Sequence, residues 1–171
     1  MPAVYVCPLS RLGATVAETG ASHIVTLINP GTPVPRPPSI VEDRHLFLGF
    51  NDISDPMDGM ILPGQDHLDN YLEFLQRWDR ESPIVIHCWA GVSRSTAGAF
   101  TALCMFRPDL PETEIAARIR ARSPEATPNS RLVALADARL GRGGRMIDAV
   151  RQIGRGANAF EGSVFSLALD E

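Results

Sequence analysis

The stretch IVIHCWAGVSRS, residues 84–95, joins a short apolar run to a long one. The run 84–86 is wholly apolar, β-branched and preceded by a Ser-Pro break, which predicts a buried parallel strand. The segment 93–106 is almost continuously apolar and is closed by Pro108, which predicts a buried helix. Cys88 therefore stands where a strand passes through a tight turn into a helix.

Outward from this stretch, apolar runs and helical periodicities alternate along most of the chain. Further strands are predicted at 4–7, 23–28 and 44–50. Helices are predicted at 10–19 with Ser10 as N-cap, 66–80, 111–122, 128–140 with Thr127 as N-cap, and 144–153. Strands that alternate with helices predict an α/β fold. We expect a central, mostly parallel sheet of about four to five strands flanked by helices, followed by a helical C-terminal part.

The length of 171 residues suits one domain with its own core. Residues 1–155 are predicted to form that domain, and residues 156–171 an irregular C-terminal tail. No apolar run approaches the roughly 18 residues of a membrane span, and the N-terminus lacks the basic start and apolar block of a secretory signal. A cytoplasmic protein without a membrane partner is therefore expected.

The composition also argues against several classes of partner and cofactor. The net charge is -4, and the arginines that gather in residues 107–155 are too few to predict nucleic-acid binding. All 16 basic residues are Arg and none is Lys, which favours a GC-rich bacterial genome as the source. The three cysteines, Cys7, Cys88 and Cys104, include no Cys-x-x-Cys pair, so neither a disulfide framework nor a metal or other cofactor is expected.

The turn after Cys88 has the chemistry of an anion site. The N-terminus of a helix presents unpaired backbone N–H groups, and Gly91 allows the backbone to wrap closely around a phosphate. Arg94 adds a planar fork that can hold two phosphate oxygens. Because helix N-termini and cations stabilise a thiolate, Cys88 is expected to be an ionised nucleophile at neutral pH.

The pattern His87-Cys88-x-Ala90-Gly91-x-Ser93-Arg94-Ser95 resembles that of the cysteine-based protein tyrosine phosphatases, and most closely the compact dual-specificity type. The resemblance runs from about residue 47 to about residue 129 and includes Ser123-Pro124-x-x-x-Pro128-Asn129. It implies the fold of these phosphatases and a two-step reaction. A thiolate attacks phosphorus to give a phosphocysteine, which water then hydrolyses.

The resemblance also implies a role for each matching residue. Cys88 would be the nucleophile, Arg94 the phosphate clamp, and Ser95 the hydroxyl that eases thiolate departure. His87 would orient the loop, and Asn129 would fix the backbone near it. Further phosphate contacts would come from the residues between nucleophile and clamp: Trp89, Ala90, Gly91, Val92 and Ser93.

Such a reaction also needs a carboxylic acid that protonates the leaving oxygen and later activates water. The acid-rich loop 51–65 offers Asp52, Asp55 and Asp58. Asp52 directly follows a predicted strand, which is where small members of the resembled family carry their acid. Asp52 is therefore the preferred general acid, with Asp55 as the second candidate.

The predicted substrate is phosphotyrosine in a protein or peptide, with phosphoserine and phosphothreonine left open. Between Cys88 and Arg94 there is no Lys or Arg, so a phosphoinositide or a polyphosphate is less favoured. The alternatives are a non-catalytic phosphate-binding or regulatory module and a phosphatase for a non-protein phosphomonoester. An arsenate reductase would need a resolving thiol from Cys7 or Cys104. The oligomeric state is left open.

Overall fold

A five-stranded sheet forms the centre of the computed structural model, which describes residues 2–171. Its strands are β1 (Ala3–Pro8), β2 (His23–Ile28), β3 (His45–Gly49), β4 (Ile84–Cys88) and β5 (Phe165–Ala168). They lie in the order β3-β2-β4-β1-β5, with the first four strands parallel and β5 antiparallel to β1. The predicted fold class, an α/β fold with a mostly parallel sheet, is confirmed.

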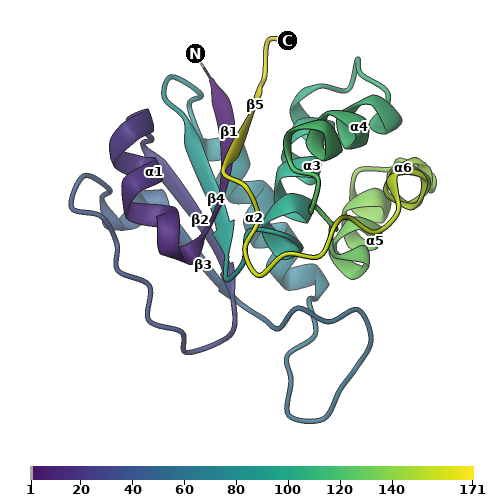
Figure 1. Ribbon diagram of the computed structural model, residues 1–171, viewed down its shortest axis with the longest axis horizontal. Helices are drawn as coiled ribbons and strands as arrows, with labels where there is room; N and C mark the ends of the chain where they lie inside the picture. The colour runs from purple at the N-terminus through teal and green to yellow at the C-terminus, as the bar shows by residue number, and fades with distance from the viewer. Residues whose placement is uncertain (1) are drawn as a thin grey trace.

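Six α-helices cover the sheet: α1 (Leu12–Thr19), α2 (Gln65–Arg77), α3 (Arg94–Phe106), α4 (Glu112–Arg122), α5 (Ser130–Arg139) and α6 (Arg145–Ile153). Helix α1 packs on one face of the sheet, and the other five helices gather on the opposite face (Figure 1). Two short 3-10 turns, Leu9–Arg11 and Glu42–Arg44, precede α1 and β3. No helix within residues 2–171 has the length and apolar character that a membrane crossing needs.

Strand β4 and helix α3 form the middle of the core. All residues of β4 are buried; Ile84 and Ile86 face the larger group of helices, and Val85 faces α1. Gly98 lets α3 approach β4 closely, because a Cβ there would lie 3.1 Å from a methyl group of Ile86. Helix α3 is buried from its first residue through Cys104, which explains its apolar sequence and fixes the position of its first turn.

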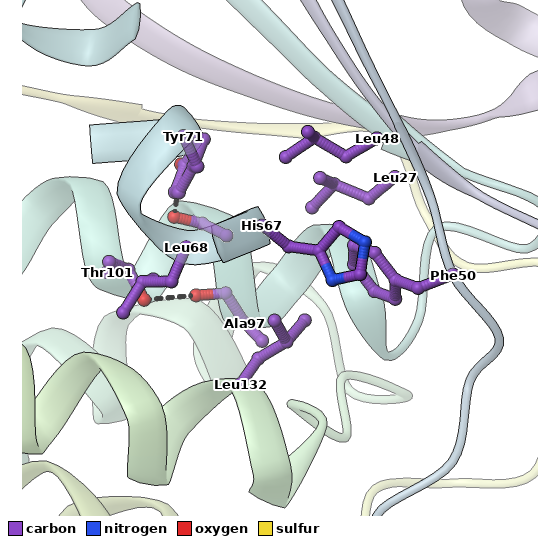
Figure 2. A pocket seen from close by; sticks show the side chains of 10 residues that line it. Leu27, Leu48, Phe50, His67, Leu68, Tyr71, Ala97, Thr101 and Leu132 are labelled. Carbon is purple, nitrogen blue, oxygen red and sulfur yellow. Dashed lines mark hydrogen bonds between the residues drawn. The ribbon is translucent and has the colours of Figure 1, made fainter. Parts of the chain in front are cut away.

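A small apolar cavity of about 10 Å³ lies between β2, β3, α2, α3 and α5 (Figure 2). On the α2 side, the hydroxyl of Tyr71 donates to the carbonyl of Gly98 at 2.6 Å. The rings of His67 and Phe50 pack against each other with their centroids 5.1 Å apart. The tight packing holds Phe50, whose own carbonyl faces Arg94.

Two predicted helix caps are wrong. Ser10 does not cap α1, because it lies in the preceding 3-10 turn and the helix begins at Leu12 without a side-chain cap. Thr127 does not cap α5 either. Asn129 is the N-cap, and its Oδ1 accepts the backbone N–H of Leu132 at 3.0 Å, so the helix begins two residues later than predicted.

The C-terminal segment 156–171 is not irregular throughout, so the predicted irregular tail is also wrong. Residues 165–168 form β5 at the edge of the sheet, paired with β1. Phe165 and Leu167 are buried while Ser166 is half-buried, an alternation of period two that is typical of an edge strand with one covered face. The last strand therefore belongs to the sheet.

Candidate active site

Cys88 is the last residue of β4 and is buried, with 2% of its surface exposed. The backbone N–H of Gly91 donates to Cys88 Sγ at 3.2 Å, and Ser95 Oγ lies 3.2 Å from the same sulfur. We call residues 88–95 the Cys88 loop. The sulfur thus lies next to one backbone N–H and one hydroxyl, at the turn between β4 and α3.

The carbonyl groups of the Cys88 loop are bound from outside by other segments. Backbone N–H groups donate to four of them: Leu9 to Trp89 (3.1 Å), Gly162 to Ala90 (2.7 Å), Thr127 to Val92 (2.9 Å) and Asn129 to Ser93 (3.1 Å). In a trans peptide the N–H points opposite to the C=O, and no peptide bond within residues 2–171 is cis. The N–H groups that follow these carbonyls, those of Ala90, Gly91, Ser93 and Arg94, therefore point into the loop, where they form a cradle for a tetrahedral oxyanion.

Gly91 occupies a position that admits no side chain. Its φ is +72°, in the left-handed region. A Cβ there would also lie 2.8 Å from the backbone nitrogen of Pro8 and 2.9 Å from the carbonyl carbon of Cys7. The end of β1 therefore supports the Cys88 loop by direct backbone contact.

The guanidinium of Arg94 is held along one edge and free along another. Its Nη1 donates to Asn29 Oδ1 at 2.7 Å and to the carbonyl of Phe50 at 2.8 Å. Its Nε is buried and has no hydrogen-bond partner among residues 2–171. A buried donor without a partner costs free energy, and an oxyanion bound by the fork would remove that cost.

Asp52 lies against the Cys88 loop. Its Oδ1 accepts hydrogen bonds from Ser93 Oγ at 2.7 Å and from Asn129 Nδ2 at 2.9 Å. Both bonds end on Oδ1, so Oδ2 is the oxygen left to carry a proton. Asp55 and Asp58 are exposed and make no side-chain hydrogen bond to the loop within residues 2–171. Of the three predicted acids, Asp52 is the one that is hydrogen-bonded to the Cys88 loop within residues 2–171.

His87 is fully buried behind the loop at the centre of a hydrogen-bonded chain. Burial lowers the pKa of His87 to about 4, so the ring is neutral at neutral pH. Its Nδ1 donates to the carbonyl of Cys88 at 3.1 Å, and its Nε2 accepts from the hydroxyl of Thr26 at 2.7 Å. Thr26 Oγ1 in turn accepts from Nε2 of His45 at 2.7 Å. His87 therefore orients the backbone of the loop and is in no position to act as a base on a substrate.

The other two cysteines, Cys7 and Cys104, are buried. Burial raises the pKa of Cys7 and of Cys104 to about 12, so both thiols stay protonated at neutral pH. All three cysteines are free. No group of three or more His, Cys, Asp or Glu side chains is placed to hold a metal ion in the described part of the chain, residues 2–171.

Most predicted site residues are connected by hydrogen bonds within the Cys88 loop or to it. Trp89 differs from them in its exposure. Its backbone belongs to the loop, and the residue is 52% exposed, whereas Cys88 and Arg94 are buried. Three further residues of this hydrogen-bonded set were not predicted from the sequence: Asn29, which holds Arg94, and the pair Thr26 and His45 behind His87. One available signal was Thr26 itself, a hydroxyl residue within the otherwise apolar run 24–28.

The chain resembles solved phosphatase structures. It superposes on the Cydia pomonella PTP-2 phosphatase with a TM-score of 0.61 and 20% identity, over 79% of this chain and 84% of that chain. Human DUSP28 gives a TM-score of 0.62 and 19% identity over 83% and 96%. The human tyrosine phosphatase-like serine/threonine/tyrosine-interacting protein gives 0.62 and 16% over 84% and 94%.

Sequence comparison adds no relative. No protein-family model matches the chain, and no curated protein matches it. The structural likeness lies below 25% identity and covers most of each chain. The chain therefore has the α/β fold of the tyrosine and dual-specificity phosphatases, as the resemblance of its Cys88 loop implied.

Proposed function

We propose that the protein hydrolyses phosphomonoesters through a phosphocysteine on Cys88. In the first step the Cys88 thiolate attacks phosphorus, an S–P bond forms, and the bond from phosphorus to the leaving oxygen breaks. Asp52 gives its proton to that oxygen, so the leaving group departs as an alcohol or phenol. The loop N–H groups and the Arg94 guanidinium hold the three remaining phosphoryl oxygens.

In the second step water hydrolyses the intermediate. Asp52, now a carboxylate, takes a proton from the water as its oxygen attacks phosphorus. The S–P bond breaks, inorganic phosphate leaves, and the thiolate is regenerated. Ser95 Oγ, 3.2 Å from Cys88 Sγ, can donate a hydrogen bond to the departing sulfur. The two steps return both Cys88 and Asp52 to their starting protonation states.

One observation carries the proposal: the buried, unpartnered Nε of Arg94 at the mouth of a loop whose N–H groups point inward. Asn29 and the Phe50 carbonyl fix the opposite edge of the same guanidinium. Arg120 and Arg142 also carry a buried Nε without a partner within residues 2–171, so the free nitrogen of Arg94 supports the proposal through its place in the Cys88 loop. A cation held along one edge beside a thiol and a ring of amides fits an incoming oxyanion.

The proposed substrate class is a phosphorylated protein or peptide, with phosphotyrosine as the preferred residue. The phosphatases with the same fold support a phosphate ester as substrate. The alternative is a module that binds phosphate in the same cradle without turnover. The structural similarity to a phosphatase-like interacting protein is the reason to test this alternative. The intact Cys88, Arg94 and Asp52 favour the enzyme.

The test is turnover of matched phosphotyrosyl and phosphoseryl peptides and of a phosphoinositide, with and without EDTA. We expect the wild type to release phosphate from the phosphotyrosyl peptide whether or not EDTA is present, because Cys88 supplies the nucleophile. The Cys88→Ser protein should bind the peptide and release no phosphate. Binding by the wild type without turnover would favour the regulatory module, and a rate abolished by EDTA would contradict the thiolate mechanism.

A further inference from the structure

A C-terminal strap, residues 154–164, runs from α6 to β5 across the outside of the Cys88 loop (Figure 1). The backbone N–H of Gly162 donates to the carbonyl of Ala90 at 2.7 Å. At the other end of the strap, the N–H of Gly156 donates to Thr127 Oγ1 at 3.0 Å and the N–H of Ala157 donates to the carbonyl of Pro124 at 3.0 Å. The strap is thus fixed on both sides of residues 158–161.

Two glycines allow the strap to lie directly on other backbone. A Cβ at Gly162 would lie 2.7 Å from the carbonyl oxygen of Gly91, and a Cβ at Gly156 would lie 2.5 Å from the carbonyl carbon of Glu125. Both distances are shorter than atoms tolerate, so these contacts need glycine. Phe160 lies between the two anchored points, yet 96% of its surface is exposed. A single exposed aromatic ring is ordinary on a protein surface, so the neighbours of Phe160 decide whether it can bind a ligand.

Phe160 has a second aromatic ring as its neighbour across a cleft. The cleft has a volume of about 370 Å³ and is lined by Trp89, Ala90, Phe160 and Glu161. Trp89 and Ala90 belong to the Cys88 loop, so the cleft borders that loop. Trp89 is 52% exposed, which leaves its ring available to a ligand.

The charge of the cleft restricts what can bind there. Glu161 is the only ionisable side chain in its lining, and its Oε1 accepts a hydrogen bond from Ser10 Oγ at 2.8 Å. The Cys88 loop adds no cation before Arg94. A second phosphate group beside the cradle would therefore meet a carboxylate and two apolar rings. An uncharged aromatic group would meet ring faces.

We propose that the strap and the Cys88 loop together form the leaving-group site, in which Phe160 and Trp89 bind the aromatic ring of a phosphotyrosyl substrate. The inference rests on the proposed function and narrows its substrate class to aryl phosphates. Phe160 then determines specificity from a segment more than 60 residues beyond the Cys88 loop. A phosphoserine lacks a ring to fill the cleft, and a phosphoinositide carries further charge toward Glu161.

The first experiment compares kcat/KM for phosphotyrosyl and phosphoseryl peptides of one sequence in the wild type, Phe160→Ala and Phe160→Tyr. We expect Phe160→Ala to lower kcat/KM about tenfold on the phosphotyrosyl peptide and less than about twofold on the phosphoseryl peptide. Phe160→Tyr should retain the wild-type ratio. Phe47→Ala is the matched control, because it also removes an exposed phenylalanine, at 41% exposure, but from β3 at the far edge of the sheet.

The second experiment measures binding without chemistry. The chain has two tryptophans, of which Trp78 is 2% exposed and Trp89 is 52% exposed. In the Cys88→Ser protein, a phosphotyrosyl peptide should change the emission of Trp89 and a phosphoseryl peptide should not. The additional change Trp89→Phe should remove that signal and leave the emission of Trp78.

The outcomes separate this inference from the proposed function. If the wild type hydrolyses phosphotyrosine and Phe160→Ala leaves the ratio of the two substrates unchanged, the strap has no part in specificity and the inference is overturned alone. Faster turnover of a phosphoinositide than of the phosphotyrosyl peptide would overturn it in the same way. If the wild type hydrolyses no phosphate ester, the proposed function and this inference both fall.

Discussion

The side chain of Asn129 joins helix α5 to the loop that carries Asp52. Its Oδ1 accepts the backbone N–H of Leu132 at 3.0 Å, and its Nδ2 donates to Asp52 Oδ1 at 2.9 Å. Its backbone N–H also donates to the carbonyl of Ser93 at 3.1 Å. One residue therefore caps a helix, supports the Cys88 loop and positions the proposed general acid.

Two substitutions at Asn129 should separate these functions. Asn129→Ala removes the cap and both bonds that Nδ2 donates, to Asp52 and to the carbonyl of Ile53. We expect the free energy of unfolding to fall by at least about 1 kcal/mol, the usual cost of losing an N-cap. Asn129→Asp keeps a cap but cannot donate to Asp52 and places a like charge beside it. We expect Asn129→Asp to keep near wild-type stability in denaturant unfolding while kcat falls about 10- to 100-fold. Equal kcat in Asn129→Asp and the wild type would show that this contact does not position the acid.

Asp52→Asn should reduce turnover according to the leaving group. A peptide phosphotyrosine or phosphoserine needs a proton on its leaving oxygen, whereas an activated aryl phosphate departs without one. We therefore expect kcat/KM, which reports the first step alone, to fall about 10²-fold or more on the peptide and much less on the activated substrate. The matched control is Asp55→Asn, which should leave both rates near wild type. A loss confined to Asp55→Asn would move the role of general acid to that residue.

Asn29 should act on catalysis through Arg94. Asn29→Ala removes a 2.7 Å bond to Nη1 and leaves the carbonyl of Phe50 as the remaining partner. We expect the inhibition constant of inorganic phosphate and the KM to rise about tenfold, with a smaller change in unfolding free energy. Asn70→Ala, at an exposed position of α2, is the control. An unchanged phosphate affinity in Asn29→Ala would contradict the role of Asn29 as a positioning residue.

His87 should make the folded state less stable in acid. Burial holds its pKa at about 4 in the folded protein, against 6.5 for an unperturbed histidine. Between these values the unfolded chain binds the extra proton, so the unfolding free energy falls as pH falls from 6.5 toward 4. The full loss for His87 is on the order of 3 kcal/mol.

The measurement is urea unfolding of the wild type and His87→Asn across that pH range. His23, His45 and His67 also have pKa values lowered by burial and contribute in the same direction, so both proteins should lose stability in acid. The loss should be smaller in His87→Asn. Identical pH slopes in the two proteins would mean that His87 is not held neutral by the fold.

The sequence predicted the parts of the site that are local in the chain. The strand, the turn and the helix around Cys88 follow from one stretch of apolar and glycine residues. The position of Arg94 at the start of α3 follows from its place in the same stretch. Asp52 could be singled out because it directly follows a predicted strand. Each of these features depends on neighbours a few residues away.

Contacts between distant segments could not be predicted in the same way. Asn29 reaches Arg94 across 65 positions, and Thr26 reaches His87 across 61, because the register of parallel strands brings them together. The cap of α5 was assigned to Thr127 because proline favours the first helical turn, but the contacts of Asn129 with Asp52 and Ser93 place the cap two residues later. Strand β5 was missed because it is short and is stabilised by pairing with β1.

The most direct test of the central role of Cys88 is to trap the covalent intermediate. Asp52→Asn protein, in which activation of water is impaired, is mixed with an activated aryl phosphate, quenched in acid and digested for peptide mass spectrometry. We predict that the peptide containing Cys88 gains one phosphoryl group and that the double variant with Cys88→Ser gains none. A phosphoryl group on any other residue, or sustained turnover by the Cys88→Ser protein, would contradict a phosphocysteine mechanism.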